Sequence, residues 1–111
     1  MNNILEDIEN LKEKVLDSNE YKDYKVSEEI LDNNKEINEL ITKIKRLQQT
    51  IIKKEDKNEN IEKEKIELNS LYQKLDTYPE YINYINASKA LNEMITYIQK
   101  EFENYFNKYI I

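Results

Sequence analysis

Cysteine, histidine and glycine are all missing from this sequence, and proline occurs only once, at Pro79. Without cysteine and histidine, the chain lacks the usual side chains for soft-metal ligation, covalent thiol chemistry and proton transfer near neutral pH. Without glycine, it lacks the residue that the tight turns of a β-sheet need most. These absences favour an all-α protein that is not an enzyme, with no cofactor, no metal site and no catalytic residues.

Long apolar runs are missing as well. Acidic residues occur among the first ten positions, and no uninterrupted apolar stretch approaches the roughly 15–20 residues of a signal or membrane helix. We therefore expect a cytoplasmic protein that does not enter a membrane. Acidic residues outnumber basic ones by 23 to 17, for a net charge of −6, and this balance disfavours wrapping of a phosphate backbone. Direct binding of nucleic acid is not expected.

The sequence is rich in helical periodicity. From Tyr81 to Tyr109, apolar or small residues recur every three or four positions, the repeat of a helix that lays one seam against other helices. Shorter stripes precede it, separated by polar turn-forming residues. The sequence predicts a single domain over residues 1–111, with four to five amphipathic helices in a bundle or hairpin array and a long C-terminal helix. The helices are expected at about 3–17, 20–32, 35–54, 60–76 and 79–109.

Helix starts are predicted where short polar side chains can accept free backbone N–H groups. Ser18 can cap the second helix, and the run of turn formers Asp32, Asn33 and Asn34 can cap the third. Thr77 is expected to cap the last helix, whose first residue, Pro79, suits a first turn because its missing N–H would be unpaired there.

Two polar stretches could carry chemistry. Asp56, Asn58, Asn60 and Glu67 have the spacing of calcium-loop ligands, but Ile61 stands where that loop needs glycine, so a solvated connection is the better interpretation.

The second stretch is a cluster of basic residues in the third predicted helix. It is either a solvated flank paired with neighbouring glutamates or a contact patch for an acidic protein surface or RNA. No aromatic residues are interleaved with it, so protein is the better partner of the two. The cluster consists of Lys43, Arg46, Lys53 and Lys54, with Lys45 nearby.

The end of the last predicted helix is unusually apolar. A helix of about 31 residues would be roughly 46 Å long and would outreach the other predicted helices. Its tip would lack cover from the chain, and exposed tyrosine-rich clusters are typical of interfaces. We expect this tip to pack against a second copy or a homologous helical protein, although the stripe from Ile4 to Val15 could instead fold back over it. The tip residues are Phe102, Tyr105, Phe106, Tyr109 and Ile110, followed by Ile111.

Two tyrosine motifs resemble those of the YlbF/YmcA family of small helical bacterial regulators. One has the form S-x-E-Y-x-x-Y before a leucine. The other is a proline-started helix of the form P-x-x-x-x-Y-x-x-A-x-x-x-L-N-x-x-I. The sequence supplies Ser18, Glu20, Tyr21, Tyr24 and Leu31 for the first motif, and Pro79, Tyr84, Ala87, Leu91, Asn92 and Ile95 for the second. The resemblance spans roughly residues 4–100.

The resemblance implies a non-enzymatic adaptor that binds protein partners and modulates mRNA processing by an RNase Y-type ribonuclease, with effects on competence, sporulation and biofilm formation. It also implies a homodimer or a hetero-oligomer with homologous helical proteins. Some family members carry cysteines and belong to an iron–sulfur complex, whereas this sequence has none and cannot supply a thiolate ligand. A self-associating helical protein with no role in RNA metabolism is the alternative.

Overall fold

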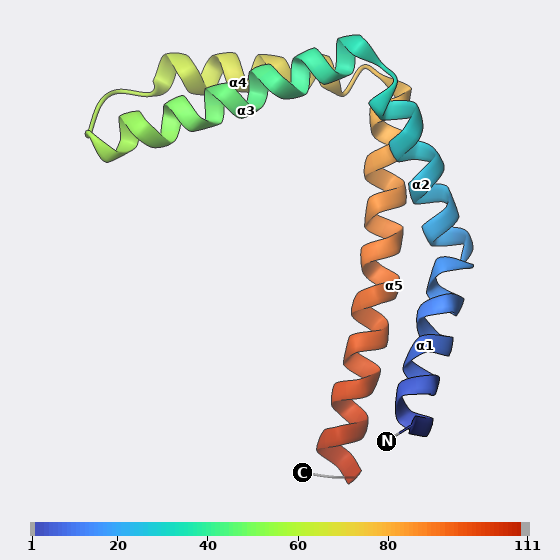
Figure 1. Cartoon of the computed structure of the whole chain (residues 1–111). Helices are drawn as coiled ribbons and strands as arrows, with labels where there is room; N and C mark the ends of the chain where they lie inside the picture. Colours follow the sequence, from blue (N-terminus) through green and yellow to red (C-terminus); the bar gives the residue numbers. More distant parts are fainter. Residues whose placement is uncertain (1, 110–111) are drawn as a thin grey trace. The chain divides into compact units, whose positions relative to one another are not determined.

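The computed structural model describes residues 2–109, which form five α-helices and no strand. Of the described residues, 89% are helical, so the expected all-α class and the long C-terminal helix are confirmed. None of the described helices combines the length and apolar character needed to cross a membrane. The helices, labelled in Figure 1, are α1 (Asn2–Leu16), α2 (Asn19–Asp32), α3 (Lys35–Asp56), α4 (Glu62–Leu75) and α5 (Pro79–Tyr109).

Side-chain caps fix two of the helix starts. The Ser18 hydroxyl accepts the backbone N–H of Tyr21 at 3.2 Å, and the Asn34 side-chain oxygen accepts that of Ile37 at 3.1 Å. The expected cap at Ser18 is confirmed, and Asn34 is the member of the run Asp32, Asn33 and Asn34 that caps α3. The expectation for Thr77 is wrong, because its hydroxyl donates to the Lys74 carbonyl at 2.7 Å and so closes the end of α4.

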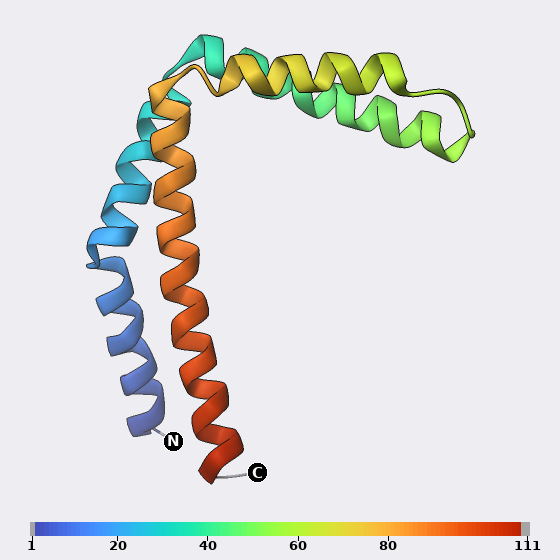
Figure 2. The same cartoon turned by 180° about the vertical axis from the view of Figure 1, so that it is seen from behind.

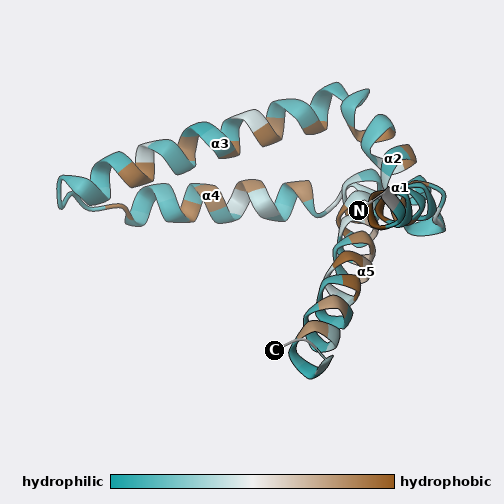
Figure 3. Cartoon of the chain, turned by 60° about the horizontal axis from the view of Figure 1, so that its bottom comes forward, coloured by the Kyte–Doolittle hydropathy of each residue, from teal (hydrophilic) through white to brown (hydrophobic). Residues whose placement is uncertain are grey.

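The chain divides into two compact units, and the first to be described is the hairpin unit, Glu29–Asn83. Here α3 and α4 run antiparallel, side by side in both Figure 1 and Figure 2. Figure 3 shows apolar segments recurring along both helices among polar ones, as expected for stripes that bury one face. The turn between them contains Asn58 with φ 57°, a left-handed conformation that asparagine tolerates better than most residues. The buried residues of this unit are Leu31, Ile37, Leu40, Ile44 and Leu75.

Polar contacts fix the register of the hairpin. The Gln48 side-chain nitrogen donates to the Tyr72 hydroxyl at 2.7 Å, and the Tyr78 hydroxyl donates to a Glu36 carboxylate oxygen at 2.8 Å. Nearer the turn, Lys54 forms an ion pair with Glu64. These contacts lie at three levels along the hairpin, so they hold the two helices in one alignment.

The second unit, here called the stem, contains the chain up to Glu28 and from Tyr84 onward. Within it, α1 and the first part of α2 lie alongside α5 and run in the opposite direction (Figures 1 and 2). Leu91 of α5 is buried. The rings of Tyr24 and Tyr84 lie with their centroids 5.6 Å apart, a separation typical of attractive aromatic pairs.

Replacing a buried residue of α3 should be far more destabilising than replacing an exposed one of the same type. Ile37 is 0% exposed, whereas Ile52 of the same helix is 59% exposed. Ile37→Ala should lower the free energy of unfolding by about 2–5 kcal/mol through lost burial and a cavity, and Ile52→Ala by less than about 0.5 kcal/mol. Urea titrations of both variants measure this difference, and equal losses would mean that the core is misplaced.

Removing the cap of α3 should have a smaller effect. Asn34→Ala leaves the N–H of Ile37 without its side-chain acceptor, and we expect a loss of about 1 kcal/mol in the free energy of unfolding. Asn34→Ser retains a capping oxygen and serves as the control, with most of the stability kept. Thermal melts followed by circular dichroism compare the two, and identical melting curves for both variants would contradict the capping role.

Candidate interaction surfaces

Four aromatic rings gather at the C-terminal end of α5 in the stem. Phe102 and Phe106 stack with their ring centroids 6.4 Å apart. Tyr105 meets Phe106 edge-on at 5.9 Å and lies 5.0 Å from Tyr109. The Lys108 amino group lies 5.3 Å from the centre of the Tyr109 ring, within the range of a cation–π contact. We call Phe102, Tyr105, Phe106 and Tyr109 the aromatic end.

Helix α1 contributes to the surroundings of the aromatic end without burying it. Leu11 lines a shallow hollow together with Phe102, Tyr105 and Phe106, and that hollow is almost entirely apolar. Phe102 nevertheless remains 48% exposed and Phe106 45% exposed. Two helices placed side by side can cover only the stripes where they touch, so the remainder of each apolar stripe faces solvent. The aromatic end and α1 thus form one extended apolar surface.

The structure places most of the predicted tip residues together. Ile110 and Ile111 lie outside the described residues. Leu11 and Tyr97, which line the same hollow, were not among the predicted site residues. The signal for Leu11 was its place in the apolar stripe of the first predicted helix. Tyr97 had no such signal, because it lies off the seam of α5.

A tyrosine cluster joins α2 to α5 in the stem. Hydrogen bonding with Tyr84 and with the Glu28 carboxylate raises the pKa of Tyr24 well above its ordinary value. Glu28 also accepts a hydrogen bond from Lys25 at 3.0 Å, and this contact, with that of Tyr24, lowers the pKa of the carboxyl group. Tyr24 belongs to the first tyrosine motif and Tyr84 to the second. Their contact indicates that these motifs hold two helices together.

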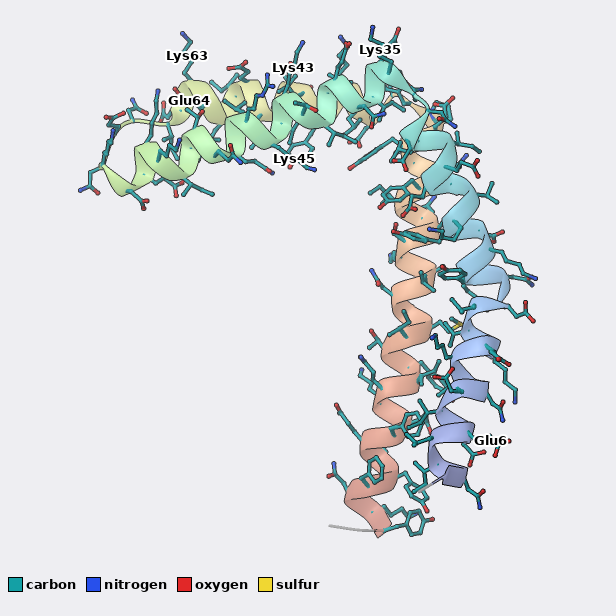
Figure 4. The ribbon with its side chains drawn as sticks, viewed as in Figure 1. Glu6, Lys35, Lys43, Lys45, Lys63 and Glu64 are labelled. Carbon is teal, nitrogen blue, oxygen red and sulfur yellow. The ribbon has the colours of Figure 1, made fainter. Side chains whose placement is uncertain are left out.

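The predicted basic cluster is divided by the structure. Lys43, Arg46 and Lys53 are exposed on α3. Lys54 instead binds Glu64, and this contact raises the pKa of the lysine and lowers that of the carboxyl group. Lys45 points to the opposite side of the hairpin from Lys43 in Figure 4. Lys54 is therefore engaged in an ion pair, and Lys45 lies on the other side of the hairpin from Lys43.

The calcium-like stretch serves as a helix connection. The Asn60 side-chain oxygen accepts the backbone N–H of Glu62 at 2.9 Å, so it helps to begin α4. Among residues 2–109, no three acidic side chains come close enough together to hold a metal ion. Among the described residues, two candidate interaction surfaces are the apolar surface of the stem and the exposed cations of α3.

Comparison with known proteins bears on the tyrosine motifs. The family model described as "Control of competence regulator ComK, YlbF/YmcA" matches residues 4–105. No curated protein and no solved structure matches the chain. The family match covers nearly all of the chain and every residue of both tyrosine motifs. This protein belongs to the YlbF/YmcA family, a family of regulators involved in the control of the competence regulator ComK.

Proposed function

We propose that this protein is a non-enzymatic adaptor of the cytoplasm, which binds protein partners and through them modulates mRNA processing by an RNase Y-type ribonuclease. Membership of a regulatory family supports the adaptor role. The full sequence contains neither cysteine nor histidine, so the side chains most often used for nucleophilic and proton-transfer catalysis near neutral pH are missing. Binding is the activity that these residues support best.

The exposed aromatic end is the observation that carries this proposal. Phenylalanine and tyrosine side chains contribute large apolar areas when they are buried, and tyrosine keeps a hydroxyl group that can stay hydrated at the rim of a contact. A cluster of four half-exposed rings beside the apolar stripe of α1 is costly for a monomer in water. A partner that covers these rings would recover that free energy.

A second copy or a homologous helical protein suits this surface best. Two helices that expose one apolar side can pack against an identical pair to form a four-helix arrangement with a closed core. Such a contact uses the same surface on both molecules, which is the commonest geometry of homodimers. The proposed assembly is therefore a homodimer or a hetero-oligomer whose interface contains Phe102, Tyr105, Phe106 and Tyr109.

Removing two of these rings should separate the assembly without unfolding the chain. We expect Phe102→Ser with Phe106→Ser to raise the dissociation constant of the dimer by at least about tenfold, because central aromatic residues contribute most of the binding free energy of an interface. Multi-angle light scattering over a dilution series measures the oligomeric state, and circular dichroism checks that the helices persist.

The matched control removes two exposed apolar residues elsewhere. Ile52 and Ile66 lie in the hairpin unit and are 59% and 72% exposed, so Ile52→Ser with Ile66→Ser should leave the dimer intact. A wild-type monomer, or equal effects of the two double variants, would rule out the aromatic end as the interface. Loss of helical signal only in the Phe102/Phe106 variant would assign those rings to the core of the stem.

The second candidate function is that of a self-associating helical protein with no role in RNA metabolism. The same aromatic end favours it, because self-association does not require a ribonuclease. Affinity capture of the wild-type protein from its native cells, in parallel with the Phe102/Phe106 double variant, separates the two functions. Recovery of a ribonuclease or of homologous helical proteins with the wild type alone supports the adaptor. Recovery of this chain and nothing else supports the alternative.

A further inference from the structure

The hairpin unit carries its charge unevenly on its two flanks. On α3, Arg46 follows Lys35 by eleven residues and Lys53 follows Arg46 by seven. These intervals are close to whole numbers of turns at 3.6 residues per turn, so the three cations lie on one side of the helix. Figure 4 shows Lys35, Lys43 and Lys63 pointing to the same side of the hairpin. We define the basic flank as Lys35, Lys43, Arg46, Lys53, Lys63 and Lys74.

The cations of the basic flank are exposed and unpaired. Every one of the six side chains is exposed. Across the described part of the chain, ion pairs join Lys22 to Asp17, Lys25 to Glu28 and Lys54 to Glu64, and none includes a member of the flank. Three exposed acids, Glu36, Glu39 and Glu67, lie among the six cations. The flank thus keeps a clear excess of positive charge in a protein whose net charge is −6.

The opposite flank of the hairpin is different in kind. Lys45 points to that side in Figure 4, and it shares the side with the Gln48–Tyr72 hydrogen bond. Lys65 lies on the same side, because it precedes Tyr72 by seven residues, close to two turns. Here basic residues are mixed with the acids Glu62 and Asp76 and with the apolar Ile52. The positive charge is therefore segregated to one flank.

We propose that the basic flank binds the acidic face of a helical protein partner, at a surface separate from the aromatic end. Four of the cations recur at helical intervals along α3 and two along α4. A second helix with carboxylates every three or four residues could lie along them with its charges in register. Glu39 and Glu67 would then face basic residues of the partner, and this mixed pattern would set the alignment and reject uniformly acidic competitors.

Protein fits this flank better than RNA does. Single-stranded RNA is bound with aromatic side chains between the cations, and the flank contains none. The hairpin unit as a whole has ten basic and twelve acidic residues, so a polyanion such as RNA would be repelled beyond the immediate patch. Glu39 and Glu67 would repel phosphates directly. An acidic protein helix that also carries basic residues opposite these glutamates would avoid both sources of repulsion.

The test uses the full-length protein and a labelled alanine-based helical peptide of about 20 residues, with glutamates every three or four positions along one side. We expect the wild type to bind this peptide in a fluorescence anisotropy titration. Lys43→Glu with Arg46→Glu should weaken the binding by at least about tenfold, and raised salt should weaken the wild-type complex. The milder pair Lys43→Gln with Arg46→Gln should give an intermediate loss.

Matched controls make the result decisive. Lys45→Glu with Lys65→Glu changes the net charge equally but on the opposite flank, so peptide affinity should stay within about twofold of the wild type. A peptide of the same composition with its glutamates spread around the helix should bind more weakly. Circular dichroism of every variant reports whether the fold is kept, and the oligomeric state from light scattering tests the aromatic end separately.

Three outcomes would overturn the proposal. The first is no binding of the glutamate peptide at low salt. The second is equal loss of binding in the two charge-reversed double variants. The third is tighter binding of a polyuridine oligonucleotide of about 20 nucleotides, lost on reversal of Lys43 and Arg46, which would assign the flank to RNA.

Discussion

Within each unit the helices pack in pairs, and this pairing is the constraint on which the rest of the structure depends. A helix with a single neighbour buries one stripe of side chains, and within each unit no further layer of described helices covers the remainder. Few side chains are therefore fully buried among the described residues, and Ile37 and Leu75 are the most enclosed of them. Stability must come from long stripes of contact and from register contacts such as those of Gln48 with Tyr72.

The same constraint separates the two surfaces of the molecule. In the stem, the contact between α1 and α5 covers only part of their apolar stripes. The apolar side chains that stay exposed include the aromatic end. In the hairpin unit, most exposed positions are charged, so the surface that it presents to solvent is mainly electrostatic in character. An apolar surface favours a stable partner and a charged one favours rapid, salt-sensitive encounters. The two units are thus suited to different kinds of contact.

Periodicity and polar breaks in the sequence were sufficient to predict the helices, because Ser18 and Asn34 act locally on the backbone beside them. The role of Thr77 was missed since its hydroxyl could serve the end of one helix or the start of the next, and the Lys74 carbonyl decides between them. The pairing of Lys54 with Glu64 and the contact of Tyr24 with Tyr84 depend on the alignment of separate helices. Spacing along a single helix carries no information about that alignment.

The register contacts also have a kinetic consequence. Lys54 and Glu64 are 10 residues apart along the chain, and Gln48 and Tyr72 are 24 apart, whereas Leu11 and Phe102 lie beside one hollow from opposite ends of the sequence. Joining distant segments costs more chain entropy than joining near ones. We therefore expect the hairpin unit to form first during folding, with its amides protected from hydrogen exchange before those of α1. An early hairpin would shorten the flexible loop between the two segments of the stem. Formation of the hairpin unit would therefore lower the entropy cost of bringing the two ends of the chain together.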